Sequence, residues 1–209
     1  MMKRLRPSDY LPVFFVLFVM VSPGCAAAPH DEAVAVLAAS KNIQSSTEHF
    51  SVCQGYGCKR RDIITFSSQD WNDVRRHFLP APEDAAEERK AIENAVAEME
   101  RLVGARNGTG ADKAGTFKGA FGHGQLDCED EALNTTLYLS LFQTKGFLRF
   151  YDVGSRARRG YFIHGWPHMT ATITEKQTQV VYVVDSWFAD NGKVPFIIAL
   201  EAWKDGAKP

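Results

Sequence analysis

The sequence predicts an α+β domain in which helices pack against an antiparallel β-sheet. Apolar residues recur at helical spacing in two long segments, 82–104 and 128–146. Segments rich in β-branched residues follow at 168–174 and 179–187 and are joined by a short polar turn. Helices followed by hairpin-connected strands are typical of this class. No repeat or domain-sized linker interrupts residues 29–209, which we therefore expect to form one domain.

Residues 1–27 have the pattern of a secretory signal peptide. Basic residues open the chain, an apolar run spans 11–21, and small residues follow. A run of this length is too short to cross a bilayer as a helix, which takes about 20 residues. Two processing routes remain open. Cleavage among residues 26–28 would release a periplasmic or secreted protein, whereas lipidation of Cys25 would anchor it to a membrane.

The charge balance argues against nucleic acid as a partner. The chain has 24 basic and 25 acidic residues. Removing the signal deletes Lys3, Arg4, Arg6 and Asp9, which leaves 21 basic and 24 acidic residues and a net charge of −3. No basic patch dominates this balance. About 180 residues remain, enough for one domain with a buried core, and we expect a monomer.

The cysteines become informative in an exported chain. Cys53 and Cys58 flank a loop with two glycines, and an oxidising compartment favours a disulfide between them. No cysteine or histidine accompanies this pair at zinc-ligand spacing. With Cys25 lipidated or removed, Cys128 has no evident partner. A free thiol is unusual in an exported protein, and a catalytic role is one explanation.

The segments before the first long helix carry weaker signals. Residues 29–60 mix small and polar side chains, and only 32–40 indicates a short helix. Residues 62–67 read as a strand. Ser67, three residues before Asp70, is a capping-box-like start for a helix that continues to about residue 78.

The most regular helix is predicted at 82–104. Its apolar residues keep helical spacing from Ile92 to Val103, acidic residues fill its first turn, and Gly104 can end it. The Gly-rich segment 105–125 has no periodicity and predicts a long loop. Long loops inside a compact domain are frequently functional.

The second long helix is predicted to begin at Cys128. Leu133, Leu137 and Leu141 share one face, and Gly146 can end the helix. Later segments are strand-like. They comprise residues 147–153, 168–174, 179–187 and 194–200, the last of which follows an Asp-Asn-Gly-Lys turn.

The predicted hairpin places a histidine beside an acid. If residues 175–178 form the turn, Thr174 pairs with Gln179, and His168 lies directly opposite Asp185. Their Cβ atoms would then be roughly 4.5–5.5 Å apart on one face. A carboxylate at that distance can accept a hydrogen bond from one imidazole nitrogen and fix the tautomer. A slip of one residue would separate the two side chains.

Cys128 would complete a catalytic triad with His168 as base and Asp185 as the orienting acid. The first turn of a helix carries unpaired N–H groups and a partial positive charge, which lower a thiol pKa and can hold an oxyanion. Each residue alone is more often structural, but the combination favours catalysis. His164 is the second candidate base, and His123 on the Gly-rich loop could line the site.

This order of residues resembles the transglutaminase-like superfamily, which is related to papain. "LDCEDEA", "HMTATI" and "YVVDSW" are similar to the motifs of bacterial transglutaminase-like cysteine proteinases, over about residues 85–190. Glu131 stands where that family usually has an aromatic residue, and Ser186 where it tends to have Asn. The resemblance implies a papain/transglutaminase-like core and periplasmic cleavage of protein or peptide substrates.

The resemblance also implies a role for the acids beside Cys128. In calcium-dependent members, the residues on either side of the catalytic cysteine help to bind the ion, which points to Asp127 and Glu129 here. Carboxylates and carbonyls are the ligands that calcium takes. Alternatively, Asp127 caps the helix and the following acids favour its positive end. The two roles can coexist.

Three functions remain open from the sequence. The leading hypothesis is an exported cysteine endopeptidase that forms a thioester on Cys128. The second is acyl transfer of the transglutaminase or amidase type with the same triad. The third is a non-catalytic envelope lipoprotein on the same fold. Apart from calcium, we expect no cofactor.

Overall fold

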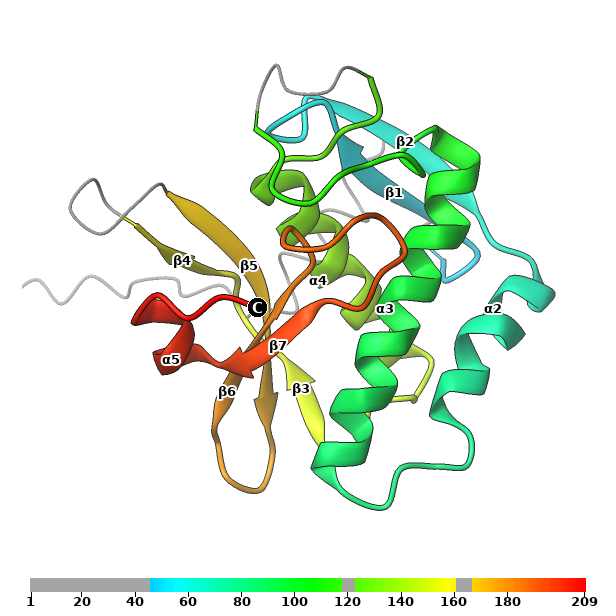
Figure 1. The fold of residues 1–209 in the computed structure, drawn as a ribbon. Coiled ribbons are helices and arrows are strands. Elements are labelled where there is room, and N and C mark those ends of the chain that lie inside the picture. Colours follow the sequence, from blue (N-terminus) through cyan, green and yellow to red (C-terminus); the bar gives the residue numbers. More distant parts are fainter. Residues whose placement is uncertain (1–45, 118–122, 161–166) are drawn as a thin grey trace, which may run out of the picture.

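The computed structural model describes residues 46–117, 123–160 and 167–209. The signal peptide, Cys25, the helix expected at 32–40 and His164 lie outside the described residues. The elements, in chain order (Figure 1), are β1 (His49–Gln54), β2 (Arg60–Thr65), α2 (Ser68–Arg75), the 3₁₀ helix η1 (Arg76–Phe78), α3 (Ala85–Asn107), α4 (Cys128–Thr144), β3 (Tyr151–Val153), β4 (Ala157–Arg159), β5 (His168–Glu175), β6 (Val181–Asp185), β7 (Phe196–Ala199) and α5 (Leu200–Lys204).

The fold is α+β with antiparallel sheets, as the sequence predicts. The larger sheet has the strand order β3-β5-β6-β7, and β4 pairs with the beginning of β5. A separate hairpin consists of β1 and β2. Helix α4 packs chiefly on β5 and also contacts β1 and α3, so it lies between the sheet and the outer helices (Figure 1). Its central position explains why most of its residues are buried.

Aromatic side chains fill the space between α2, η1 and the end of α4. Trp71, Phe78 and Phe142 are buried, and Phe147 contacts all three rings. Burying one large apolar side chain contributes about 1.5–3 kcal/mol. This cluster fixes the carboxyl end of α4, whereas the Cys128 end depends on other contacts.

Helix α3 is longer than the sequence predicts. It runs to Asn107 and ends at Gly108, which has a left-handed φ of 83°. The prediction that Gly104 ends the helix is therefore wrong. Gly104 lies inside it, where a Cβ would stand 2.8 Å from the Gly110 Cα. Its lack of a side chain permits a close approach of the following loop rather than a turn.

The β1–β2 hairpin contains the disulfide that the sequence predicts between Cys53 and Cys58. Strand β1 itself was not predicted. All of its residues after His49 are buried, so the alternation of polar and apolar residues that marks a half-exposed strand is absent. Asn134 of α4 holds this strand, since its side chain accepts from the Cys53 N–H at 2.7 Å and donates to the Cys53 carbonyl at 2.9 Å.

The turn between β5 and β6 lies one residue later than predicted. It comprises residues 176–179, and Gln179 adopts a left-handed φ of 60°, which the usual preference of turns for Gly or Asn does not anticipate. Thr174 consequently pairs with Val181, so the predicted register is wrong by two residues. A shift of two keeps every side chain on its predicted face, because the side-chain period of a strand is two.

The carboxyl-terminal segment differs most from the prediction. Strand β4 and helix α5 were not predicted, and β3 is shorter than the segment 147–153. Helix α5 lies beside β6 and β7 (Figure 1). It places Trp203, which is fully buried, against the end of β6. A single helical turn with one apolar anchor carries too little periodicity to be recognised in a sequence.

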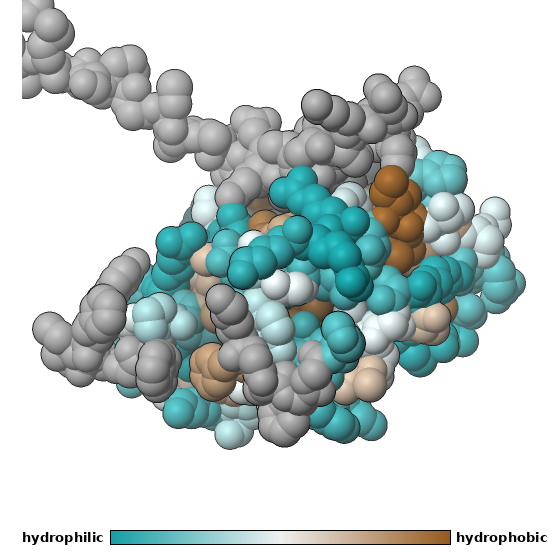
Figure 2. All heavy atoms as spheres, turned by 90° about the horizontal axis from the view of Figure 1, so that it is seen from above, coloured by the Kyte–Doolittle hydropathy of each residue, from teal (hydrophilic) through white to brown (hydrophobic). Residues whose placement is uncertain are grey.

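The surface shows no large apolar face from the direction of Figure 2. Hydrophilic residues predominate there, and hydrophobic ones form small separate areas. Isolated exposed apolar side chains are ordinary for a folded domain. In the described part of the chain, no helix combines the length and the apolar character needed to cross a bilayer.

Candidate active site

Cys128 is the first residue of α4, as predicted, and its thiol is free and half-buried. Asp127 precedes it as the N-cap. One carboxylate oxygen of Asp127 accepts from the backbone N–H groups of Glu129 at 3.1 Å and Asp130 at 2.9 Å. The capping role expected for Asp127 is therefore confirmed. It fixes the backbone that carries Cys128.

The same cap occupies most of the expected oxyanion site. The N–H groups of Glu129 and Asp130 donate to the Asp127 side chain, and that of Glu131 donates to the Asp127 carbonyl at 3.0 Å. The Cys128 N–H remains as the first-turn amide that no described residue engages. The expectation that several first-turn amides hold an oxyanion is wrong, because the cap residue satisfies them first.

His168 and Asp185 are hydrogen-bonded, with 2.7 Å between His168 Nε2 and Asp185 Oδ2. The sequence predicted that these two residues lie directly opposite each other, and this prediction is wrong. Since Ala171 pairs with Val184, Asp185 lies alongside Thr170, two residues from His168 on the same face. Such diagonal neighbours are within reach of a long side chain. Both residues are buried, with 7% and 1% of their surfaces exposed.

The other imidazole nitrogen of His168 is unoccupied. Nδ1 is buried and has no hydrogen-bond partner among the residues that the structure describes. Cys128 and His168 line the same cavity, of about 290 Å³, together with Arg158 and Met169. Because Asp185 holds Nε2, Nδ1 is the nitrogen left for proton exchange with a group in this cavity.

The surroundings of Cys128 raise the pKa of its thiol. Burial is the largest cause, and the carboxylates of Asp127, Asp185 and Glu129 act in the same direction. A hydrogen bond from the backbone N–H of Met169 partly opposes them. On balance these surroundings favour the thiol over the thiolate.

Aromatic rings enclose the imidazole of His168. The ring centroid of Trp187 lies 4.7 Å away, that of Phe188 5.3 Å and that of Trp203 5.6 Å. Trp203 also donates from Nε1 to Asp185 Oδ2 at 2.8 Å. Sequence reasoning missed Trp203, because it lies on a helix that was not predicted and 18 residues beyond its partner.

The acids beside Cys128 are only partly free to bind a cation. Within residues 46–117, 123–160 and 167–209, no three His, Cys, Asp or Glu side chains form a group that could hold a metal ion. Both oxygens of Asp130 accept backbone N–H groups, from Tyr56 and Cys58, at 2.7 Å each. Asp127 and Glu129 therefore supply two carboxylates of the kind calcium takes, and further ligands would come from carbonyls or water.

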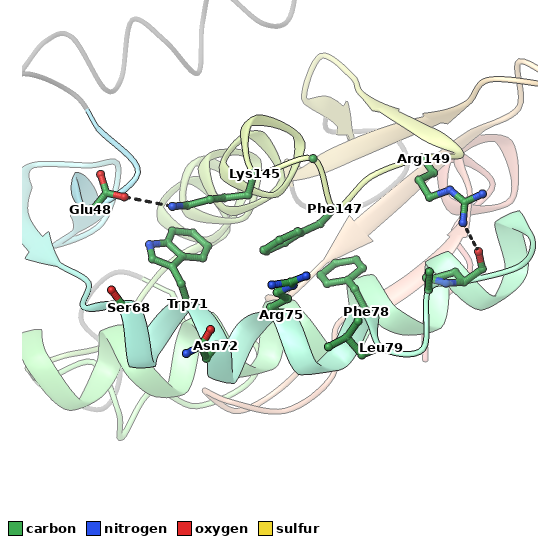
Figure 3. A pocket seen from close by; sticks show the side chains of 13 residues that line it. Glu48, Ser68, Trp71, Asn72, Arg75, Phe78, Leu79, Lys145, Phe147 and Arg149 are labelled. Carbon is green, nitrogen blue, oxygen red and sulfur yellow. Dashed lines mark hydrogen bonds and ion pairs between the residues drawn. The ribbon is translucent and has the colours of Figure 1, made fainter.

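Two other features lie away from this site. His123, which could have lined it, is exposed and is not among the described residues around either cavity at His168. A cavity of about 620 Å³ lies at the opposite end of α4, walled by Trp71 and Phe147 (Figure 3). The 17 residues of α4, at about 1.5 Å each, separate it from Cys128 by about 25 Å.

No protein-family model matches the chain, and comparisons with curated proteins and with solved structures find no match either.

Proposed function

We propose that the chain is an exported cysteine endopeptidase with a papain/transglutaminase-like core, acting as a monomer on protein or peptide substrates. Cys128 is its nucleophile, His168 its base and Asp185 the acid that orients the base. One observation carries the proposal. His168 is held through Nε2 by Asp185 at 2.7 Å, and its buried Nδ1 has no partner in the described structure beside the cavity that Cys128 lines. The signal-like pattern of residues 1–27 supports export.

Acylation begins with the transfer of the Cys128 Sγ proton to His168 Nδ1. Sγ attacks the carbonyl carbon of the substrate, and the Cys128 N–H lies at the helix N-terminus, where it can donate to the oxygen that becomes negative. Collapse of the tetrahedral intermediate breaks the C–N bond. His168 Nδ1 gives its proton to the leaving nitrogen, and the acyl group remains on Cys128 as a thioester.

Deacylation reverses the roles. A water molecule transfers a proton to His168 Nδ1 and attacks the thioester carbon. The C–S bond breaks, the Cys128 sulfur regains the proton from His168, and a carboxylic acid leaves. Asp185 stabilises the imidazolium that forms in both halves of the cycle.

The decisive experiment replaces the nucleophile. Cys128→Ala should lower the rate of cleavage of a fluorescently labelled protein by about 10³-fold or more. The change removes one sulfur from a half-buried position, so the free energy of unfolding should change by no more than about 1 kcal/mol. Full activity in the Cys128→Ala protein would exclude the mechanism.

Adding a primary amine separates hydrolysis from acyl transfer, because transfer incorporates the amine into the product.

Calcium is part of the proposal, with Asp127 and Glu129 as its side-chain ligands. The ion would offset the negative charge that these two residues place beside the Cys128 thiol. Calorimetric titration of calcium into the Cys128→Ala protein should detect one site, which Glu129→Gln should weaken. The control Glu201→Gln changes an exposed acid on α5. Equal calcium binding by all three proteins would remove calcium from the proposal.

A further inference from the structure

A second cavity, of about 450 Å³, adjoins the one that contains Cys128. The two cavities share His168, Pro167 and Arg159, but Cys128 lines only the smaller one. The larger cavity therefore shares the His168 wall with the Cys128 cavity but is not lined by the nucleophile.

The described walls of this second cavity combine aromatic rings with cations. Trp187 and Phe188, which also enclose the His168 ring, are among the aromatic residues that line it. Arg159, Lys204 and Lys208 supply three positive charges. Among the described residues that line it, none is acidic. Lys204 is the last residue of α5, and Lys208 lies in the segment that follows this helix.

The three cations are not equally available to a ligand. The Arg159 guanidinium donates to the carbonyls of Trp203 and Ala207 and stacks on the Trp203 ring at 4.4 Å, so it is committed to holding this wall. Lys204 has only a solvent-exposed partner, Glu201, at 3.4 Å, and such pairs contribute little. In the described part of the chain, Lys208 has no ion-pair partner. The two lysines are thus free to meet an anion.

The position of the proton donor decides which part of a substrate lies near this cavity. His168 Nδ1 delivers a proton to the leaving nitrogen, so the leaving segment must pass the imidazole. The acyl segment stays on Cys128. Of the two adjoining cavities, the one that His168 lines and Cys128 does not is therefore placed to receive the leaving segment.

We propose that this cavity binds a carboxylate on the leaving segment of the substrate, and that the enzyme consequently prefers an acidic residue or a free carboxyl terminus just after the cleaved bond. The inference rests on the proposed function. Hydrogen bonds between an ammonium group and a carboxylate are charge-assisted and are about twice as strong as neutral ones.

The test compares peptides that differ only in the leaving segment. One series has an amidated carboxyl terminus with Glu, Gln or Lys at the first or second leaving position, and a matched peptide with Gln has a free carboxyl terminus. The wild-type protein should cleave a Glu peptide or the free-acid peptide with a kcat/KM about tenfold above that of the amidated Gln peptide. The amidated and free-acid arms distinguish a side-chain carboxylate from a terminal one, and either result supports the proposal.

The variant Lys204→Gln/Lys208→Gln should abolish this preference by raising KM for the acidic peptide to the value for the amidated Gln peptide. The control Lys90→Gln/Lys176→Gln removes two lysines that pair with acids on other faces and should keep the preference. Equal cleavage of acidic and neutral peptides by the wild-type protein would overturn the proposal. So would a preference that survives in Lys204→Gln/Lys208→Gln.

Binding measurements separate failure of this inference from failure of the proposed function. The same peptides are titrated onto Cys128→Ala protein with and without Lys204→Gln/Lys208→Gln, and fluorescence anisotropy measures Kd. Weaker binding of the acidic peptide when the lysines are absent supports the carboxylate site even if no peptide is cleaved. Unchanged binding overturns it. If the acidic peptide binds through the lysines but no peptide is cleaved, only the proposed protease function is overturned.

Discussion

Cys128 is subject to two opposing influences at the residue scale. The amino terminus of α4 favours its thiolate, whereas burial and three nearby carboxylates favour its thiol and raise its pKa. Under the proposed function the base must therefore be well positioned, and Asp185 holds His168 in place together with Trp203. His168 and Trp203 both donate to Asp185 Oδ2, at 2.7 and 2.8 Å. Under the proposed function, Trp203 acts on the reaction through Asp185 and is a positioning residue.

Trp203→Phe should lower kcat several-fold with little change in KM. The change keeps an aromatic ring against His168 but removes one of the two donors to a buried carboxylate oxygen. The control Trp71→Phe also loses an indole hydrogen bond, from Nε1 to the Thr47 carbonyl at 3.0 Å, but far from the site. Both variants should lose about 1 kcal/mol of stability. Equal kcat values for them, measured with one labelled substrate, would show that the Trp203 bond is only structural.

At the scale of elements, the disulfide loop is tied to the amino-terminal end of α4, where Cys128 lies. Asp130 is fully buried on the first turn of α4 and accepts the N–H groups of Tyr56 and Cys58, one on each oxygen. Burial and the nearby Asp127 charge raise the Asp130 pKa to about 6. The two N–H groups oppose this rise. The hairpin and the helix therefore share one buried carboxylate that is ionised above about pH 6.

Asp130→Asn should lower the free energy of unfolding by about 1–3 kcal/mol, because an amide offers one oxygen to two buried N–H donors and its own NH₂ faces the other. Urea denaturation at pH 7.5 followed by tryptophan fluorescence measures the loss. Asp152→Asn, at an exposed position on β3, is the matched control and should be neutral. Identical denaturation midpoints for the two variants would contradict this role of Asp130.

At the scale of the whole molecule, a cluster of buried carboxyl groups joins separate parts of the fold behind the site. Glu100 of α3, Asp112 of the Gly-rich loop and Glu131 of α4 interact with one another. Burial raises the pKa of Glu100 to about 8 and that of Asp112 to about 6, and it raises the pKa of Glu131 above its usual range.

The cluster predicts that stability falls as pH rises. A carboxyl group whose folded-state pKa is raised contributes most below its unfolded pKa, and that contribution is lost as pH rises through the folded value. For Glu100 this window runs from its ordinary value of 4.5 to about 8. The free energy of unfolding should therefore be lower at pH 8 than at pH 5 by at least about 1 kcal/mol.

Glu100→Gln, a neutral isostere, should flatten this dependence. Urea denaturation at several pH values between 5 and 8 checks both expectations. The control Glu93→Gln changes an acid on the same helix that pairs with Lys90 at 2.7 Å and should keep the wild-type slope. A wild-type protein whose stability rises steadily over this range would contradict the account of the cluster.

Local patterns predicted those features that depend on a few neighbouring residues. The start of α4 at Cys128 follows from the capping residue Asp127 and from the apolar spacing after it. The disulfide follows from two cysteines around a short Gly-containing loop. The shared face of His168 and Asp185 was also predictable, since an error of two residues in register does not change the face of a strand.

By itself, then, the sequence determined the class of the fold, the position of Cys128 at the start of a helix and the shared strand face of His168 and Asp185. These properties follow from the spacing of apolar residues, from the helix-capping residue and from the two-residue repeat of a strand. All three depend only on residues that are close together in the chain. Only the tertiary structure decided that Trp203 donates a hydrogen bond to Asp185 and that Asp127 occupies the first-turn amides. It also decided that Lys204 and Lys208 line one cavity with Arg159 and His168. Such contacts join residues that are distant in the chain, and packing, not local pattern, brings them together.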